Sequence, residues 1–366
     1  MSMPKPPSRE KLDQVIEFLD QQLRPTATWS IKDEYPLVFS EANRGNIRFV
    51  EDEQNNEILS HAVSKYLITK TPIGIFKVAA IGSVVTNPMY RNKGYSREVL
   101  ASSLEAAKKH GCDFAILWTD LYDFYRKIGF ELAGSEVSLT LNDNFHPPTP
   151  LMRIECTSKV SAESLLSLYN NHRVGTIRNI HDMSAYLKIP NMKVYTAWDA
   201  NNKLLAYAVE GKGADLSGYI HEWGGGVTEL MALFKHIQTS QRRNITVISP
   251  GHSENLIRQC KDAGAFVNNG YLGMIQLLDT RNLFFKIKRY ARSLGFDNFV
   301  MEQQGKSYCF GDGQNKLYRT DQASDLIRLL FGPYQSQDIY NFDEHTKKVL
   351  SQLFPIPMWI WGWDSI

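Results

Sequence analysis

The sequence predicts an α/β (α+β) protein with two similar units in tandem, followed by a smaller third unit. Its 366 residues correspond to two or three domains of ordinary size. Amphipathic, helix-like segments alternate with β-branched, strand-like segments. The same order of elements comes twice, over residues 1–150 and 151–280, and a different order follows over 281–366.

The composition is that of an ordinary globular protein, with 43% hydrophobic and 22% charged residues. Lys plus Arg number 41 and Asp plus Glu 39, so the net charge is +2, which argues against nucleic-acid binding. The four cysteines lie far apart without a CxxC pair, so we expect no zinc or other metal site. The chain begins without an apolar signal segment and contains no run of about 18 apolar residues. We therefore expect a soluble, cytoplasmic protein that does not enter a membrane.

In the first unit, Ser8 precedes apolar residues at helical spacing, which predicts a helix. Periodicity and turn residues place the expected elements at 8–23 (helix), 37–41, 47–51, 58–68 and 74–86 (strands), 96–110 (helix), 114–119 (strand), 122–128 (helix) and 136–141 (strand). The proline-rich segment His146–Pro150 ends the unit, because three prolines in four positions fit neither a helix nor a central strand.

The second unit repeats this order, with expected helices at 161–169, 227–239 and 254–263 and strands at 193–198, 204–210, 218–223 and 244–248. The third unit does not, with expected strands at 298–303 and 307–310 and helices at 323–331 and 344–353. The last thirteen residues, Phe354–Ile366, are apolar and rich in tryptophan. An exposed tail of this composition would aggregate, so we expect it to be buried.

The segment between the strand at 74–86 and the next helix is the most informative one. A helix start carries unpaired N–H groups and the positive end of the helix dipole, which suits a phosphate or pyrophosphate. Arg91 and Lys93 add positive charge, and Gly94 permits close approach of the backbone. We expect the backbone at Gly94 to be too crowded for a larger side chain. The alternative is an ordinary strand–turn–helix with a glycine in the turn.

A second segment, Phe124–Phe130, follows this loop and reads FYRKIGF. The alternative for Tyr125 is an aromatic core residue beside Phe124 and Phe130. Together, the Arg-x-x-Gly-x-Ser loop and this segment resemble the R/Q-x-x-G-x-G/A pyrophosphate loop and the F-Y-x-x-x-G-F signature of the GCN5-related N-acetyltransferase (GNAT) superfamily. Ser96 stands in the final small position of the loop.

The resemblance implies tandem GNAT domains, each with a mixed, mostly antiparallel sheet flanked by helices, and an acetyl-CoA-dependent N-acetyltransferase. Tyr125 would be the general acid that protonates the thiolate of coenzyme A. Neither motif contains a cysteine, so we expect direct transfer in a ternary complex. The residues implied to bind acetyl-CoA are Val84, Val85, Thr86, Arg91, Asn92, Lys93, Gly94, Tyr95, Ser96 and Arg97.

The order of the three units resembles the Eis-type branch of this superfamily. It implies a catalytic GNAT domain (1–150), a degenerate GNAT-like domain (151–280) and a small α+β domain like sterol carrier proteins (281–366). The junction Tyr219–Gly226 of the second unit lacks the loop motif, so we expect this unit to form a wall of the substrate cleft. The resemblance also implies that the α-carboxylate of Ile366 enters the active site and accepts the proton of the amine. The alternative is a tail that only packs the third unit against the first.

The expected acceptor is an amine of a small molecule, a polyamine or aminoglycoside, or a lysine. We expect no nucleic-acid or membrane partner, and self-association to a homo-oligomer is left open. Glu41, Asp52 and Asp120 are the carboxylates considered for attracting a cationic acceptor, whereas His61 is expected to be structural. The alternatives to an enzyme are a non-catalytic acyl-CoA sensor and, for the third unit, a lipid-binding role that would need a large apolar cavity.

Overall fold

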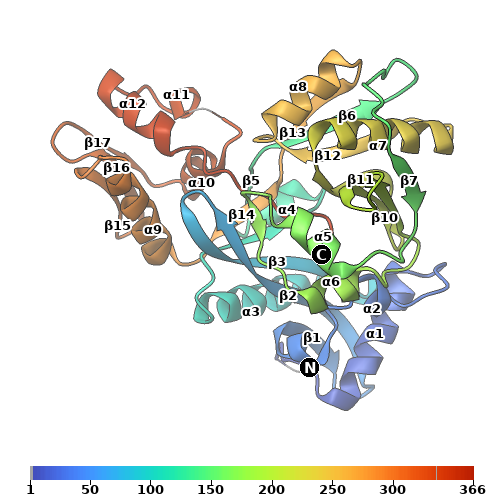
Figure 1. The fold of residues 1–366 in the computed structure, drawn as a ribbon. Helices are drawn as coiled ribbons and strands as arrows, with labels where there is room; N and C mark the ends of the chain where they lie inside the picture. The colour runs from blue at the N-terminus through green and yellow to red at the C-terminus, as the bar shows by residue number, and fades with distance from the viewer. Residues whose placement is uncertain (1–2, 335) are drawn as a thin grey trace.

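The computed structural model describes residues 3–334 and 336–366 and contains three β-sheets with helices packed against them (Figure 1). Helices and strands alternate along the chain, so the predicted α/β class is confirmed. The third unit lies at the edge of the molecule, away from the N-terminal helices (Figure 1). No helix among the described residues is long and apolar enough to cross a membrane.

The first sheet has the strand order β1-β2-β3-β4-β14-β5, and the short strand β8 pairs with β2. Strands β3 and β4 are parallel, and the other neighbouring pairs are antiparallel. The strands are β1 (Ile47–Asp52), β2 (Glu57–Thr71), β3 (Gly74–Thr86), β4 (Phe114–Leu117), β14 (Gly273–Leu277), β5 (Glu131–Ala133) and β8 (Gly175–Thr176).

Helices cover both faces of the strands β1 and β2. Successive residues of a strand point to opposite faces, so Phe49 packs against α1 (Arg9–Leu23) while Val50 packs against α3 (Tyr95–Lys109). The buried residues Val99, Ser103 and Ala107 repeat every four positions along α3, which places them on one face of that helix. The remaining short helices of this unit are α2 (Ile31–Glu34), η1 (Glu41–Asn46), η2 (Pro88–Tyr90) and α4 (Tyr122–Arg126).

The second sheet repeats the plan of the first, with the order β13-β6-β12-β11-β10-β9-β7 and one parallel pair, β11 with β12. Its strands are β7 (Arg153–Cys156), β9 (Lys193–Trp198), β10 (Leu204–Lys212), β11 (Asp215–Gly225), β12 (Ile245–Pro250), β6 (Glu136–Leu141) and β13 (Phe266–Gly270). The helices of this unit are α5 (Ala162–Tyr169), α6 (Ile180–Tyr186), α7 (Val227–Gln241) and α8 (Glu254–Asp262).

The two sheets exchange one strand each. Strand β6 follows β5 after a short turn but lies between β13 and β12 of the second sheet, while β14 follows β13 and lies between β4 and β5 of the first. The two sheets are thereby interlocked across the sequence position at which we divided the first two units. The alternation of residues within β6 predicts a strand but does not say which sheet the strand joins.

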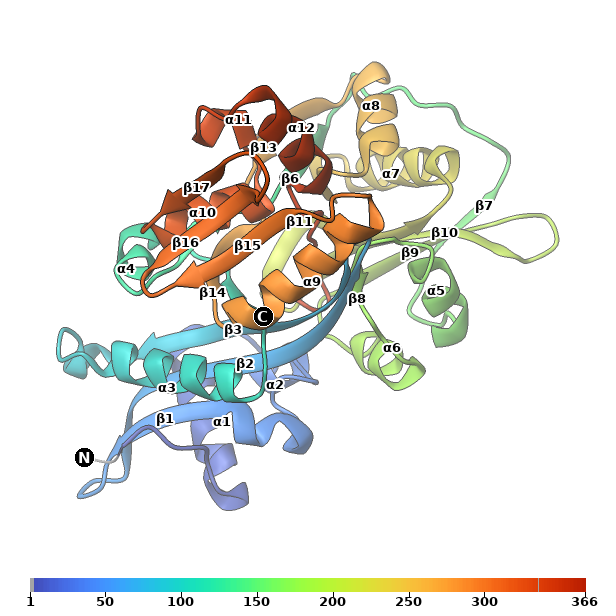
Figure 2. The same cartoon turned by 90° about the vertical axis from the view of Figure 1, so that its left-hand side faces the viewer.

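The third sheet is antiparallel, with the order β15-β16-β17. Two of its flanking helices, α9 and α10, contact strands of the first sheet (Figure 2). The elements of this unit are α9 (Thr280–Ser293), β15 (Phe299–Gln304), β16 (Ser307–Asp312), β17 (Leu317–Thr320), α10 (Ala323–Phe331), α11 (Ser336–Ile339) and α12 (Glu344–Leu353).

One expected strand is wrong. Residues 37–40 form turns and bends rather than a strand, and Glu41 begins η1. Val38 and Phe39 are buried among apolar residues of α1 and β1. The amides of both residues donate to the carbonyl of Tyr35, which closes the chain into a turn. Short apolar runs of this kind do not distinguish a strand from a buried turn.

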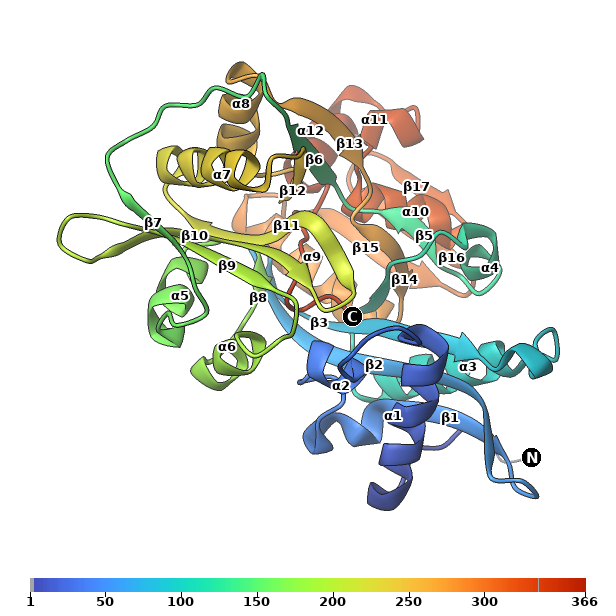
Figure 3. The ribbon, with the colours of Figure 1, turned by 90° about the vertical axis from the view of Figure 1, so that its right-hand side faces the viewer.

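The tail after α12 runs into the middle of the molecule, and the C-terminus lies inside the outline in all three ribbon views (Figures 1, 2 and 3). Trp359, Trp361 and Trp363 are each at most 2% exposed. The tail therefore connects the third unit with the space between the first two sheets.

Candidate active site

The first cavity of interest lies where strands β3 and β4 separate. They pair only from Val78 to Ala80 of β3, after which β3 continues to Thr86 beside β2 alone. A cavity of about 570 Å³ opens there. We call it the donor cavity; its lining residues are Gln22, Leu23, Val84, Val85, Thr86, Tyr90, Arg91, Asn92, Gly94, Tyr95, Ser96, Leu121, Phe124 and Tyr125.

Gly94 forms the N-cap of α3 in the left-handed conformation, with φ at +92°, and no side chain caps the helix. The first amides of the helix lack partners within the helix, so this end is suited to an anion. The expectation of a crowded backbone at Gly94 is wrong, because an added Cβ would meet no atom within 4 Å. The glycine is explained instead by its positive φ, which other residues rarely adopt.

Four polar or charged residues at this helix start are exposed, and they divide into two groups. Arg91 and Asn92 line the donor cavity. Lys93 and Arg97 do not line it, and the ammonium of Lys93 lies 4.9 Å from the centre of the Tyr90 ring. Eight of the ten predicted acetyl-CoA-binding residues therefore lie around one cavity.

Tyr125 stands at the same cavity and is 6% exposed. The rings of Phe124 and Phe130 meet it edge-on, with centroids at 5.0 and 5.9 Å. Burial raises the pKa of Tyr125 to about 12, so the phenol is protonated at neutral pH. Within the described residues its hydroxyl makes no hydrogen bond, which leaves it available to a ligand.

A β-bulge bends β3 beside the donor cavity. The pairing register with β2 shifts between His61 and Val63, and Ser83 has a φ of +48°. The Nδ1–H of the fully buried His61 donates to the carbonyl of Ser83 at 2.8 Å. Burial lowers the pKa of His61 to about 4, so the ring is neutral and holds the bulge.

Gly82, next to this bulge, is the place where the end of the chain meets β3. A Cβ on Gly82 would lie 2.6 Å from the carboxyl carbon of Ile366 and 2.8 Å from its oxygen. Only glycine leaves room for this contact. The terminal carboxylate thus contacts β3 at Gly82. Two residues further along the same strand, Val84 lines the donor cavity.

The second unit holds the tail in place through two buried cations. The ammonium of Lys212 donates to the carbonyl oxygens of Gly362 at 2.9 Å and Ser365 at 2.6 Å. Burial lowers the pKa of Lys212 to about 7. Arg178 contacts the carboxylates of Glu222 at 2.8 Å and Asp364 at 2.7 Å. Although burial acts against the charged form, these two carboxylates raise the pKa of Arg178 well above its usual value.

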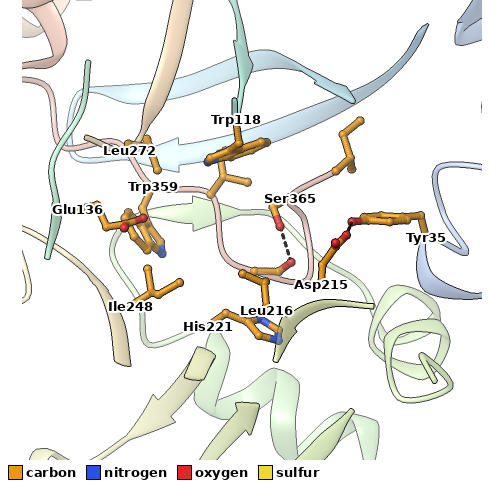
Figure 4. A pocket seen from close by; sticks show the side chains of 13 residues that line it. Tyr35, Trp118, Glu136, Asp215, Leu216, His221, Ile248, Leu272, Trp359 and Ser365 are labelled. Carbon is orange, nitrogen blue, oxygen red and sulfur yellow. Dashed lines mark hydrogen bonds between the residues drawn. The ribbon is translucent and has the colours of Figure 1, made fainter. Parts of the chain in front are cut away.

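A second cavity of about 460 Å³ lies between the two sheets and the tail (Figure 4). We call it the acceptor cavity. Its lining residues are Tyr35, Trp118, Glu136, Asp215, Leu216, His221, Ile248, Leu272, Trp359, Ile360, Gly362, Ser365 and Ile366.

The carboxylates considered from the sequence are not those at this cavity. Glu41, Asp52 and Asp120 do not line it, whereas Glu136 and Asp215 do. Glu136 begins the exchanged strand β6 and Asp215 begins β11, so only the tertiary fold brings them together. Their spacing in the sequence gives no signal of this.

His221 and Glu222, at the corresponding bulge of β11, have structural contacts. The Nε2–H of His221 donates to the carbonyl of Gly211 at 2.9 Å, and burial lowers the pKa of the ring to about 3. Glu222 pairs with Arg178. Among the described residues there is no group of three or more His, Cys, Asp or Glu that could hold a metal ion.

Comparison with known proteins agrees with this geometry. Residues 4–133 match the family model described as an acetyltransferase (GNAT) domain. No curated protein matches the chain by sequence. The segment matched by the family model contains the donor cavity, Gly94 and Tyr125.

Solved structures share the fold over nearly the whole chain. A GCN5-related N-acetyltransferase from Anabaena variabilis has a TM-score of 0.68 at 14% identity, covering 99% of both chains. A probable N-acyltransferase from Enterococcus faecalis has a TM-score of 0.65 at 16% identity, covering 97% of both. Eis1 from Mycobacterium abscessus has a TM-score of 0.65 at 12% identity, covering 100% of both.

The predicted recognition of a GNAT protein with an Eis-like arrangement is thus confirmed, whereas the likeness of the third unit to sterol carrier proteins stays a prediction. Residues 4–133 form an acetyltransferase domain of the GNAT family, and the chain as a whole has the fold of Eis1.

Proposed function

We propose that the protein is an N-acetyltransferase that moves the acetyl group of acetyl-CoA to an amine by direct attack in a ternary complex. GNAT acetyltransferases as a family use acetyl-CoA, and the matched residues 4–133 contain Tyr125 and the Arg-x-x-Gly-x-Ser loop, which resemble the family's motifs. The observation that carries the proposal is the single cavity that joins the free end of β3, the start of α3 and Tyr125.

The donor would lie along β3, with its pyrophosphate at the start of α3 near Arg91 and Gly94. Amides and positive charge at that position match the charge of a pyrophosphate. The acetyl end would then face the bulge of β3, where backbone N–H groups can hold the thioester oxygen as negative charge develops on it.

The acceptor amine would enter from the acceptor cavity and attack the thioester carbon. As the new C–N bond forms and the C–S bond breaks, the leaving thiolate takes the proton of the Tyr125 hydroxyl. The carboxylate of Ile366 faces the amine from the other side. Its ordinary pKa is far below that of an amine, so it mainly orients the amine and stabilises the positive charge on nitrogen until that nitrogen loses its proton to water. A proton from water then restores the Tyr125 hydroxyl.

A panel of amines with acetyl-CoA, followed by release of free thiol, tests this function. We expect thiol release that depends on both substrates and yields the N-acetyl product. Exchange of Tyr125→Phe should lower kcat by about 100-fold, the usual size of a general-acid effect, and leave affinity for acetyl-CoA nearly unchanged.

Tyr122→Phe is the matched control, because Tyr122 lies on the same short helix, is 41% exposed and does not line the donor cavity. It should behave as wild type. Wild-type kcat in Tyr125→Phe, measured where chemistry limits the rate, would remove Tyr125 from the mechanism. Binding of acetyl-CoA without transfer to any amine would favour an acyl-CoA sensor instead.

A further inference from the structure

The two side-chain carboxyl groups of the acceptor cavity differ in their surroundings. Asp215 accepts hydrogen bonds from the hydroxyl of Tyr35 at 2.5 Å and from Arg24 at 2.7 Å, so its charge is compensated. Within the described residues the Glu136 side chain makes no hydrogen bond or ion pair. Figure 4 shows the two groups on opposite sides of the cavity.

Glu136 is fixed in an apolar wall. Its backbone lies between Pro250 and Gly270 in the second sheet, because β6 pairs with both β12 and β13. Trp118, Ile248 and Leu272 line the cavity with it. Burial raises the pKa of Glu136 to about 7. A carboxylate in such surroundings is unfavourable unless a cation meets it, and no cationic side chain lines this cavity.

A second polar group at the cavity also lacks a partner. Trp359 is 2% exposed, and its indole N–H is buried without a hydrogen-bond acceptor among the described residues. The Nδ1 of His221, which also lines the cavity, is a third buried atom without a partner among the described residues. Buried polar groups are nearly always paired, and several unpaired groups at one cavity therefore point to a ligand. The ligand would bring a cation for Glu136 and a hydrogen-bond acceptor for the indole.

We propose that Glu136 determines acceptor specificity by binding a cationic group of the acceptor other than the amine that is acetylated. This rests on the proposed function, because it takes this cavity as the acceptor site. The preferred acceptor is then a diamine whose apolar spacer contacts Trp118 and Leu272. Its reacting amine lies toward Ile366, whose neighbour Ser365 is on the side of the cavity away from Glu136 (Figure 4).

The test compares a homologous series of linear α,ω-diamines with the n-alkylamines of the same length, in wild type and in Glu136→Gln. Glutamine keeps the size of the side chain and removes its charge. We expect wild type to prefer the best diamine over its matched monoamine by at least about tenfold in kcat/KM, mainly through KM. The reason is that the monoamine has no second amine and so cannot make the charge-assisted contact with Glu136. In Glu136→Gln this preference should disappear.

Glu254→Gln serves as the control, since it removes the same charge from an exposed position on α8 outside the cavity. It should retain the full preference. The other titratable groups facing the cavity are Tyr35, Asp215, His221 and the carboxylate of Ile366. The diamine preference of wild type should rise about tenfold from about pH 6 to about pH 8, as Glu136 ionises, and should stay constant in Glu136→Gln.

Equal use of diamines and monoamines by wild type would overturn the proposal, and so would an undiminished preference in Glu136→Gln. A wild-type protein that binds acetyl-CoA and acetylates other amines but neither probe would also overturn it, while leaving the proposed function standing. A protein that transfers acetyl to no amine would overturn the proposed function itself.

Discussion

The two sheets of this molecule share one plan but differ at the point where their parallel strands separate. In the first half, the bulge of β3 opens into the donor cavity. In the second half, the corresponding bulge of β11 at His221 is covered by the tail. The amide of Gly362 donates to the carbonyl of His221 at 3.1 Å, and Trp361 meets Trp223 edge-on at 4.8 Å.

The helices that follow the two bulges differ as well. Gly94 is the N-cap of α3 and follows a loop with two basic residues, Arg91 and Lys93. Gly226 is the N-cap of α7, and the residues just before it include no Arg or Lys. The carboxylate of Glu229 contacts the space where a Cβ on Gly226 would lie. A phosphate at the start of α7 would therefore meet the negative charge of Glu229. A phosphate at the start of α3 would instead meet the positive charges of Arg91 and Lys93.

This comparison teaches that two sheets of the same plan can differ in whether their bulge opens into a cavity, because in the second half the chain's own tail fills the corresponding position. The tail takes the hydrogen bonds that the second bulge offers, and the second unit supplies Lys212 and Arg178 to fix it. The second half thus positions the end of the chain at Gly82 of the first half.

The buried Arg178 gives the largest expected effect. Arg178→Met would leave Glu222 and Asp364 buried without their cation, which costs about 3–5 kcal/mol in free energy of unfolding. Lys109→Met removes a cation from the exposed pair with Glu105 and should lower the free energy of unfolding far less, because water already solvates both partners. Denaturant unfolding of both variants measures the difference. Equal, small losses would show that the second half does not depend on this cluster.

The position of the terminal carboxylate gives the next largest effect. A few residues added after Ile366 would displace the carboxylate from Gly82 while Trp359 and Trp361 can stay packed. We expect kcat to fall by about 100-fold, as for loss of a group that orients the amine and stabilises its developing charge, with acetyl-CoA affinity kept. The same residues added before Met1 are the control. Full activity of the C-terminally extended protein would show that the carboxylate has no part in the reaction and that the tail only packs the units together.

Glu136 gives a smaller effect that depends on pH. Its pKa is about 7 in the folded protein and 4.5 in the unfolded chain, so folding favours the protonated form. Stability is unaffected by this group below the unfolded pKa and falls as pH rises from 4.5 to about 7. Above pH 7, Glu136→Gln should be more stable than wild type by on the order of 2 kcal/mol, allowing for partial exposure. Parallel stability curves of the two proteins across this range would contradict the burial of a free carboxyl.

Much of the donor site could be predicted from the sequence, because it is built from local segments. Gly94 and Tyr125 each lie in a short motif whose strand or helix the periodicity predicts. The acceptor site could not, because Glu136 reaches it through the exchange of β6, and the alternation of a strand does not specify its sheet. The contact of Ile366 with Gly82 had one local signal, a glycine inside a strand, which often marks close approach of another backbone.

The central claim is that the first half alone binds the acyl donor. Calorimetric titration with acetyl-CoA tests it most directly, in wild type, Gly94→Glu and Gly111→Glu. Gly111 is the matched control, because it follows the other end of α3, also has a positive φ and also has no atom within 4 Å of an added Cβ. We predict one site per chain, kept in Gly111→Glu and abolished in folded Gly94→Glu by repulsion of the pyrophosphate. Two sites in wild type, or unchanged affinity in Gly94→Glu, would contradict the account.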